Sequence, residues 1–285
     1  MKKTLNKTKI ADFATYIGVV IAFIVMNALM NEGLLTRSMK GQLVPICCYI
    51  VMAVSLNLTV GILGELSLGH AGFMSVGAFT GVVTAMSLQS AIPSDGVRLA
   101  LAIVMGAIFA GIAGTLVGIP VLRLHGDYLA IVTLAFGEII KELINCLIIG
   151  HDENGLHIIF NATGAKTVTD LGLTETGKVL IKGAQGATGT DTIASFTAGF
   201  ILIMVTLIVV LNLARSRSGR AIMALRDNRI AAESVGINVT KYKLMAFVTS
   251  AALAGGAGAL YGLNFSNLVS SKFDFNTPIL ILVFV

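Results

Sequence analysis

Long apolar stretches separated by short polar ones make up most of the chain. Runs of about 20 mostly apolar residues recur, and a run of that length crosses a bilayer as a helix. The runs lack the strict alternation of apolar and polar positions that is typical of membrane β-strands, so we predict helices rather than a β-barrel. The predicted spans cover residues 12–31, 42–63, 72–90, 97–121, 127–149, 193–213 and 244–263.

An eighth apolar segment begins near Pro278. Seven apolar residues follow this proline, whereas a helix needs about 20 residues to cross a bilayer. We therefore expect an eighth span that is cut short at Val285. The predicted fold class is an all-α integral membrane protein, a polytopic helical bundle that forms one domain over residues 1–285.

Charged residues are scarce, which excludes an ordinary soluble domain. They make up 12% of the 285 residues, and hydrophobic residues make up 55%, whereas a soluble domain carries about 25% charged residues. The net charge of +5 does not indicate nucleic-acid binding, because basic residues of membrane proteins gather in cytoplasmic loops. Cys47, Cys48 and Cys146 lie in apolar runs without metal-ligand spacing, so we interpret them as buried, inert thiols.

Basic residues are concentrated in two segments. The N-terminus carries several lysines and precedes an apolar stretch without a signal-peptide cleavage pattern, which we interpret as a retained first span. Residues 214–243 carry the second group, which comprises Arg215, Arg217, Arg220, Arg226, Arg229, Lys241 and Lys243. Alternating spans put both groups on one side, which the excess of Lys and Arg marks as cytoplasmic. Residues 150–192 then form an extracytoplasmic loop, and 214–243 a cytoplasmic one.

Glycines inside the predicted spans recur at a spacing of four residues. The pairs are Gly77 with Gly81, Gly114 with Gly118, and Gly258 with Gly262. Each pair gives its helix a small face, along which a second helix backbone can approach closely in lipid. We expect these faces to pack within the chain rather than to specify a dimer.

One stretch imitates a nucleotide-binding loop. Residues 172–179, GLTETGKV, have the glycine and lysine spacing of a P-loop, but Val179 stands where a P-loop needs Ser or Thr to hold magnesium. The stretch follows no predicted strand, and no catalytic or metal-ligand cluster appears elsewhere in the sequence. We predict that the chain itself is not an enzyme and binds no cofactor.

The stretch GELSLGHAGF interrupts the apolar pattern between the second and third spans. Its glycines loosen a helix, and broken helices with free backbone groups often build transport sites near the middle of a membrane. We therefore predict a broken or re-entrant segment near residues 64–72, with Glu65, Ser67, Gly69 and His70 as candidates for a substrate pathway. The alternative is a tight cytoplasmic hairpin, in which Glu65 and His70 contact water.

The fifth predicted span carries charged residues. Asp127 can cap its start. Glu138 lies near the middle of the span, three residues before Lys141, so these two side chains can pair on one helix face. We favour this structural pair, and the alternative is that Glu138 faces the substrate pathway.

The segment SGRAIMALRDNRIAAESVGIN, residues 218–238, is a polar interruption between two apolar spans. Asp227 or Asn228 can act as the N-cap of a new helix over residues 229–235. Gly236 suits the left-handed position that ends a helix. We predict a two-turn helix across the cytoplasmic mouth of the bundle.

The composition of this short helix favours contact with another protein. Ala231 and Ala232 have small side chains, so the groove of a partner can approach the helix backbone. Neighbouring charges such as Arg226 and Glu233 can set the register of docking. The alternative is an amphipathic helix on the lipid surface, but the thin apolar face and the Ala-Ala-Glu centre suit lipid badly.

Three stretches of the chain resemble one family of membrane proteins. They are GELSLGHAGFMSVGAF, GDYLAIVTLAFGEI and SGRAIMALRDNRIAAESVGINVTKYKLMAFVTSAALAGGAGALYG. In this order they are similar to the permease subunits of high-affinity branched-chain amino-acid ABC importers, and specifically to the M-type member of the permease pair. The resemblance extends from Val44 to the end of the chain.

This resemblance implies a bacterial cell-membrane permease with several partners. They would be a related H-type permease, two cytoplasmic ATP-binding subunits and an extracytoplasmic substrate-binding protein. In ABC importers a cytoplasmic loop with a Glu-Ala-Ala-like helix docks into the ATPase, and the matching residues here are Ala231, Ala232, Glu233 and Gly236. Closure of the ATPase pair on ATP would then move this helix and open the pathway to each side in turn.

Two alternatives stay open at the level of the sequence. One is a permease of the same class for urea or short amides, which the ligand of the substrate-binding protein would reveal. The other is a stand-alone secondary transporter driven by ions, which would take up substrate without any ATPase subunit.

Overall fold

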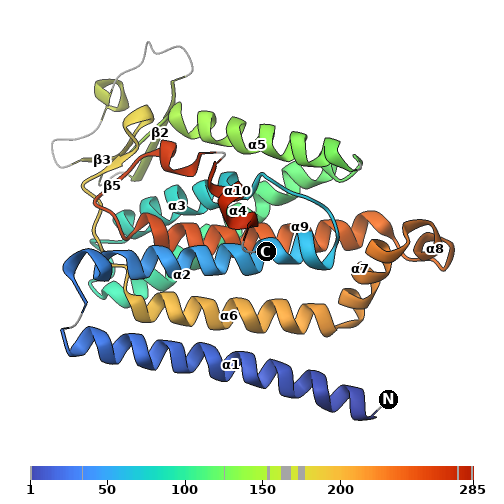
Figure 1. The fold of residues 1–285 in the computed structure, drawn as a ribbon. Coiled ribbons are helices and arrows are strands. Elements are labelled where there is room, and N and C mark those ends of the chain that lie inside the picture. Colours follow the sequence, from blue (N-terminus) through green and yellow to red (C-terminus); the bar gives the residue numbers. More distant parts are fainter. Residues whose placement is uncertain are drawn as a thin grey trace.

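Helices form most of the molecule (Figure 1), a computed structural model that describes residues 2–33, 35–124, 126–152, 155–161, 168–172, 177–274, 276–283 and 285. The helices are α1 (Lys2–Asn31), α2 (Arg37–Asn57), α3 (His70–Ser87), α4 (Asp95–Val121), α5 (Asp127–Asn145), α6 (Phe196–Arg215), α7 (Arg217–Asp227), α8 (Arg229–Ser234), α9 (Val239–Gly262) and α10 (Asn276–Leu282). A π-helical turn, η1 (Leu58–Ile62), continues α2. Three 3-10 turns lie in loops, namely η2 (Val168–Leu171), η3 (Gly183–Gln185) and η4 (Ser270–Phe273).

Five of the described helices are long and apolar enough to cross a membrane. They comprise Phe13–Asn31, Arg37–Ile62, Asp95–Val121, Phe196–Arg215 and Val239–Gly262. The helices α3 and α5 lie where two further spans are predicted, with 18 and 19 residues. The seven-residue α10 lies where the eighth is predicted.

The centre of the bundle is built from α3, α4 and α9, which pack closely on one another. Their glycines make this approach possible. A side chain on Gly77 would overlap the backbone of Gly255, and one on Gly258 would overlap the carbonyl oxygen of Met74. The predicted packing of small faces within the chain is thereby confirmed for these helices.

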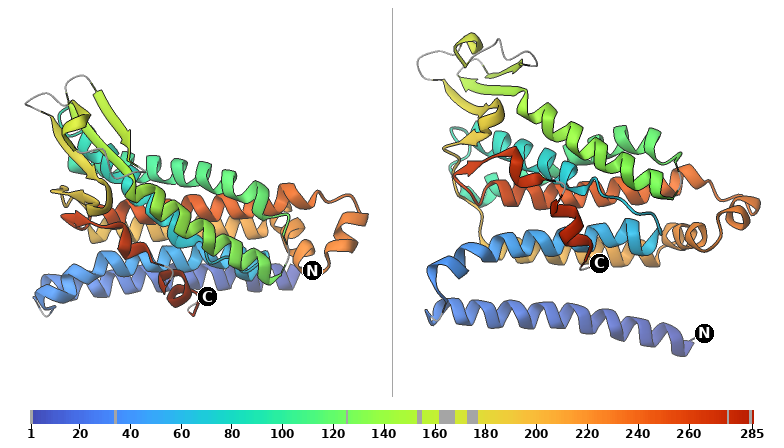
Figure 2. Two further views of the ribbon diagram at one scale, coloured as in Figure 1. Left: turned by 90° about the horizontal axis from the view of Figure 1, so that it is seen from above. Right: turned by 45° about the horizontal axis from the view of Figure 1, so that its top comes forward.

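The remaining long helices lie around this centre (Figures 1 and 2). α2 packs against α9 and α6, and α5 packs against α3. α1 lies at the margin, where Phe23 stacks on Phe196 and Phe200 of α6 with ring centroids 5.3 Å and 4.1 Å apart. The start of α1 lies at the same end of the bundle as α7 and α8 (Figure 1).

The all-α prediction is wrong at the opposite end of the bundle, where a small antiparallel sheet lies (Figure 1). Its strands are β1 (Leu147–Asp152), β2 (Gly155–Phe160), β3 (Lys178–Lys182), β4 (Ala187–Thr188) and β5 (Asn267–Leu268), in the order β2-β1-β3-β4-β5. Most of it belongs to the predicted loop 150–192. Residues 173–176 of the P-loop-like stretch lie outside the described residues, and Val179 lies in β3.

Both ends of α5 differ from the prediction. Gly126 rather than Asp127 occupies the N-cap position. The helix ends at Asn145 instead of near residue 149, because the chain from Leu147 onward forms β1. A short, isoleucine-rich apolar run fits a buried strand as well as the end of a helix, so its periodicity alone does not decide between them.

Candidate functional site

The segment between α6 and α9 folds into two short capped helices. Asn228 rather than Asp227 is the N-cap of α8, and its side chain accepts a hydrogen bond from the amide of Ala231 at 3.0 Å. Ser216 and Asn238 cap α7 and α9 in the same way. Each cap satisfies an amide that the first helical turn leaves without a partner.

The end of α8 follows the pattern predicted from Gly236. This glycine has a φ of +86°, and its amide donates to the carbonyl oxygen of Glu233 at 3.0 Å. The amide of Ile237 donates to the carbonyl oxygen of Ala232 at 3.1 Å. These two bonds form a Schellman motif, for which a left-handed residue is required. The short helix and its glycine stop are confirmed, whereas its contact with an ATPase stays a prediction.

The exposed side of α8 differs from the one that the sequence suggested. Ala232 is buried against Leu225 and Val239, so it faces this chain and not a partner. Ile230 and Val235 are 81% and 75% exposed. α8 protrudes at one end of the bundle (Figure 2).

The sequence reasoning missed Ile230 and Val235 because it looked for small side chains. Large apolar residues on both sides of the exposed Glu233 were the available signal. Ile230 lies in the six-residue α8 and Val235 is its C-cap residue, and both side chains are largely exposed. Exposed apolar groups among polar ones are typical of protein interfaces.

Arg226, at the end of α7, points toward the bundle. Its Nη1 atom donates to the carbonyl oxygen of Gly61 in η1 at 2.7 Å. Asp227, the next residue, is 71% exposed at its side chain and lies 3.4 Å from the guanidinium group of Arg226. The side chain of Arg226 is 45% exposed despite this bond, so Asp227 is the more exposed of the two residues.

The chain between η1 and α3 is not helical. Residues 63–69 lead from the end of α2 back to the start of α3 (Figure 1), and Gly64 has a φ of +78°, which favours glycine. Ser67 and His70 are buried, so the alternative of a hairpin with a water-exposed His70 is wrong. The structure thus contains the break predicted near residues 64–72.

A buried polar cluster forms where α3 begins. The Nε2 atom of His70 lies 2.6 Å from the hydroxyl oxygen of Ser250 on α9. Its Nδ1 atom lies 3.4 Å from the hydroxyl oxygen of Ser67. Ser250 also donates a hydrogen bond to the carbonyl oxygen of Ser55 on α2. The cluster therefore joins α2, α3 and α9 at the break.

Glu65 forms an ion pair with Lys243, near the start of α9. The Nζ atom of Lys243 contacts the Oε1 atom of Glu65, and the two side chains are 6% and 18% exposed. The Oε2 atom of Glu65 is buried without a hydrogen-bond partner among the described residues. Sequence reasoning missed Lys243 and Ser250 as partners of the break. Their spacing of seven residues, which puts both on one face of a helix, was the available signal.

α5 packs on the break from the other side. A side chain on Gly69 would come 3.4 Å or closer to several atoms of Thr133, and one on Gly72 would come 2.8 Å from the Cα of Gly137. The amide of Leu68 donates to the hydroxyl of Thr133 at 3.1 Å. Gly69, one of the predicted pathway residues, therefore serves a close backbone contact.

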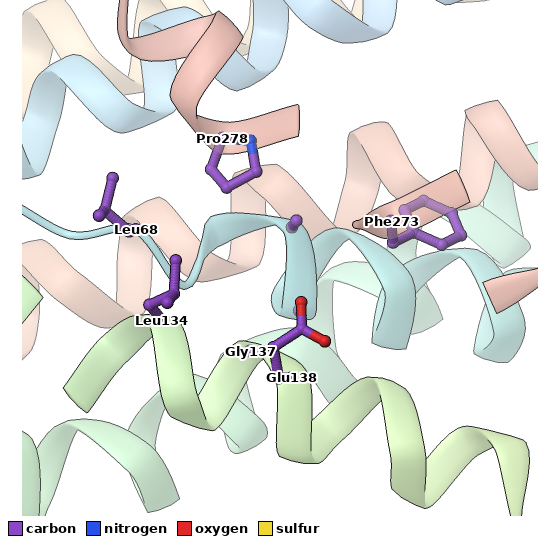
Figure 3. A pocket seen from close by; sticks show the side chains of 8 residues that line it. Leu68, Leu134, Gly137, Glu138, Phe273 and Pro278 are labelled. Carbon is purple, nitrogen blue, oxygen red and sulfur yellow. The ribbon is translucent and has the colours of Figure 1, made fainter. Parts of the chain in front are cut away.

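Glu138 pairs with Lys141, as the sequence predicts, and Lys141 also lies 3.7 Å from Asp274. Glu138 at the same time lines a narrow pocket between α3, α5 and α10 (Figure 3). Leu68 of the break and Pro278 of α10 lie on other sides of this pocket. Glu138 of α5 and His70 of α3 thus flank the break from different helices.

Comparison with known proteins places the chain in a family. A family model for the permease component of branched-chain amino acid transport systems matches residues 38–285. The chain belongs to this permease family. No solved structure gives a significant match to it.

Two curated relatives of this permease carry the name high-affinity branched-chain amino acid transport system permease protein LivM. They come from Escherichia coli (strain K12) and Salmonella typhimurium (strain LT2), and each is 33% identical over 247 residues. The alignment covers 83% of this chain and 55% of each relative. The permease chain thus spans about half the length of the curated relatives that it matches.

Proposed function

We propose that the chain is a translocation subunit of an ABC importer for branched-chain amino acids in a bacterial cell membrane. The match of the permease family model over residues 38–285 carries this proposal. The names of the two relatives support leucine, isoleucine and valine as substrates. ATP hydrolysis belongs to partner subunits, and this chain supplies helices that move.

The proposed topology has eight spans and a cytoplasmic N-terminus. Five apolar helices, together with α3 and α5, supply seven of the spans, and α10 lies at the place of the eighth. The lysine-rich start of α1 and the arginine-rich α7 lie at one end of the bundle (Figure 1), which supports the cytoplasmic assignment of that end. The sheet at the other end is then extracytoplasmic, where a substrate-binding protein delivers its ligand.

α8 is the proposed coupling helix for two cytoplasmic ATP-binding subunits, one of which docks on this chain. Ile230 and Val235 are its apolar anchors, and the exposed Glu233 lies between them. A few residues that become buried on binding typically carry most of the energy of an interface. An H-type permease completes the pore, and lipid covers the remaining apolar faces.

The proposed substrate pathway passes the break at residues 63–69. The cluster of Ser67, His70 and Ser250 places polar groups where three helices meet. The Glu65–Lys243 pair lies between this cluster and the α8 end, since Lys243 precedes Ser250 by two helical turns. The pathway opens to either side as the helices rock against the paired permease.

Substrate uptake tests the proposal directly. Cells without other high-affinity uptake of branched-chain amino acids, expressing the chain with its permease, ATPase and binding-protein partners, should accumulate radiolabelled leucine. Removal of the ATPase subunits should abolish this uptake. Uptake of urea instead of leucine would move the chain to the short-amide importers. Leucine uptake that persists without the ATPase would replace the proposal by an ion-driven transporter.

Docking at α8 is tested by a matched pair of substitutions. Ile230→Asp should reduce co-purification of the ATPase about tenfold, because it removes an apolar anchor from the interface. Ile158→Asp, on β2, replaces an isoleucine that is 63% exposed at the opposite end of the bundle, and it should leave ATPase recovery unchanged. Equal recovery with both variants would contradict docking at α8.

A further inference from the structure

The contact between α7 and the π-helical turn η1 connects the two parts of the candidate site. The guanidinium group of Arg226 donates to the carbonyl oxygen of Gly61 at 2.7 Å, across 165 residues of sequence. A side chain on Gly64 would overlap the Cγ atom of Arg226, so the stem of this arginine lies over the start of the break. Arg226 thus covers the end of η1 and Gly64, where the chain leaves the helix and turns back toward α3.

Apolar packing extends the connection in both directions. Ile222 of α7 is fully buried with Leu58, the first residue of η1, and with Leu63, which directly follows η1. About one turn further along α7, Leu225 packs with Ala232 of α8. A displacement of α8 is therefore carried to η1 through side chains in van der Waals contact, which close packing makes stiff.

η1 is suited to change its shape. A π-turn is a rare departure from α-helical bonding that occurs frequently at functional sites. In η1 the amide of Leu63 bonds the carbonyl oxygen of Leu58 at 3.2 Å, and the amide of Glu65 bonds that of Thr59 at 3.0 Å. Arg226 bonds the carbonyl oxygen of Gly61, so this side chain takes part in the bonding of the turn.

The ion pair of Glu65 with Lys243 lies directly beyond this turn. Glu65 follows Gly64, which Arg226 covers, and the amide of Glu65 belongs to the bonding of η1. A change in η1 therefore moves the carboxylate of Glu65 relative to Lys243 on α9. Because both side chains are largely buried, separation of this pair requires water or a new partner at the same place.

We propose that Arg226 is a positioning residue that transmits movement of α8 to the break, where the Glu65–Lys243 pair acts as the cytoplasmic gate. The inference rests on the proposed function and adds to it the route by which ATPase closure reaches the pathway. Arg226 acts within this chain and makes no contact with substrate. Arginine suits this role because its planar donor groups are held in a fixed geometry, whereas a lysine offers one mobile ammonium group.

The transporter reconstituted in lipid vesicles tests this role through the number of substrate molecules imported per ATP hydrolysed. Arg226→Gln should lower this ratio about tenfold, since it removes a charge-assisted hydrogen bond. Recovery of the ATPase subunits and the KM for the loaded binding protein should stay as in the unmodified transporter. Arg226→Lys should give an intermediate ratio. Arg220→Gln, on the same helix, should leave the ratio unchanged, because Arg220 bonds the carbonyl oxygen of Arg215 and not η1.

Gly64→Ala provides a second test if Arg226→Gln does not fold. The added methyl group would displace the arginine stem and strain the left-handed backbone at residue 64 without removing the charge of Arg226, and it should also lower the ratio. An unchanged ratio in Arg226→Gln, an equal fall in Arg220→Gln, or loss of ATPase recovery in Arg226→Gln would each overturn the transmission role. If the unmodified transporter shows no ATP-driven uptake, the proposed function itself fails.

Discussion

Ser250 has a single hydroxyl proton, and its neighbours decide where that proton goes. The carbonyl oxygen of Ser55 can only accept, so the hydroxyl of Ser250 donates to it. The Nε2 atom of His70, 2.6 Å from the same hydroxyl oxygen, must then carry a proton and donate. In a neutral ring, Nδ1 then accepts from Ser67, 3.4 Å away. The surrounding residues thus fix one tautomer of a neutral imidazole.

This arrangement predicts that the hydroxyl of Ser250 is structurally important. Ser250→Ala should lower the free energy of unfolding by about 1–3 kcal/mol, because it leaves buried groups of His70 and Ser55 without a partner. Thr249→Ala is the control, since its hydroxyl bonds only carbonyl oxygens of its own helix, at 2.8 Å and 3.0 Å. Thermal unfolding in detergent measures both, and equal effects would contradict the network.

At the scale of single residues, the sequence predicts features that depend only on neighbouring residues, such as helix caps and helix stops. Asn228 and Gly236 are recognisable because a cap and a helix stop involve neighbours within a few residues. The partners of Glu65 and His70 cannot be recognised in this way, since Lys243 and Ser250 lie 178 and 180 residues away in the chain. Only the packing of α3 on α9 brings these groups together.

At the scale of elements, α9 is the helix on which the others are assembled. It packs against α2, α3, α4 and α6. On the side that faces α3, Gly258 lies against the backbone of Met74, where no side chain fits. Gly256, two residues earlier, has ordinary contacts, since the nearest atom to an added methyl group would be 3.6 Å away.

Alanine substitutions at these two glycines should change the free energy of unfolding in different directions. Gly258→Ala should lower the free energy of unfolding by about 1–3 kcal/mol, because the methyl group forces α3 and α9 apart. Gly256→Ala should leave stability equal or raise it by up to about 1 kcal/mol, because alanine favours a helix more than glycine does. Thermal unfolding of both variants in detergent is the measurement. A lower melting temperature for Gly256→Ala alone would contradict the packing described.

The elements that the sequence predicts are those with long, uniform patterns. Apolar length locates α1, α2, α4, α6 and α9. The sheet escapes prediction because its strands have two to six residues and its last strand comes after α9. Such short segments are defined by their partners in the ladder, which a single sequence does not show.

At the scale of the whole molecule, the two ends differ in chemistry. One end carries the basic α7 and the apolar tip of α8, and the other carries the sheet (Figure 1). The break lies between them, with the Glu65–Lys243 pair toward α8.

Thiol labelling tests this orientation. In a Cys146→Ser background, a membrane-impermeant maleimide should label Ile158→Cys in intact cells. It should label Glu233→Cys only in inside-out vesicles, because α8 is proposed to face the cytoplasm. Cys47 and Cys48 are buried and should not react in either preparation. Labelling of Glu233→Cys from outside the cell would refute the topology and, with it, docking of an ATPase at α8.

The pairing of β4 with β5 sets an order of events during biosynthesis. Ala187 lies opposite Leu268, and the chain between them includes α6, α7, α8 and α9. While the ribosome is still making those helices, β4 has an unpaired edge, which invites wrong partners. The sheet becomes complete only when α9 and β5 have both been made and β5 has paired with β4. A nascent chain is therefore most vulnerable to misassembly in the interval between the synthesis of these two strands.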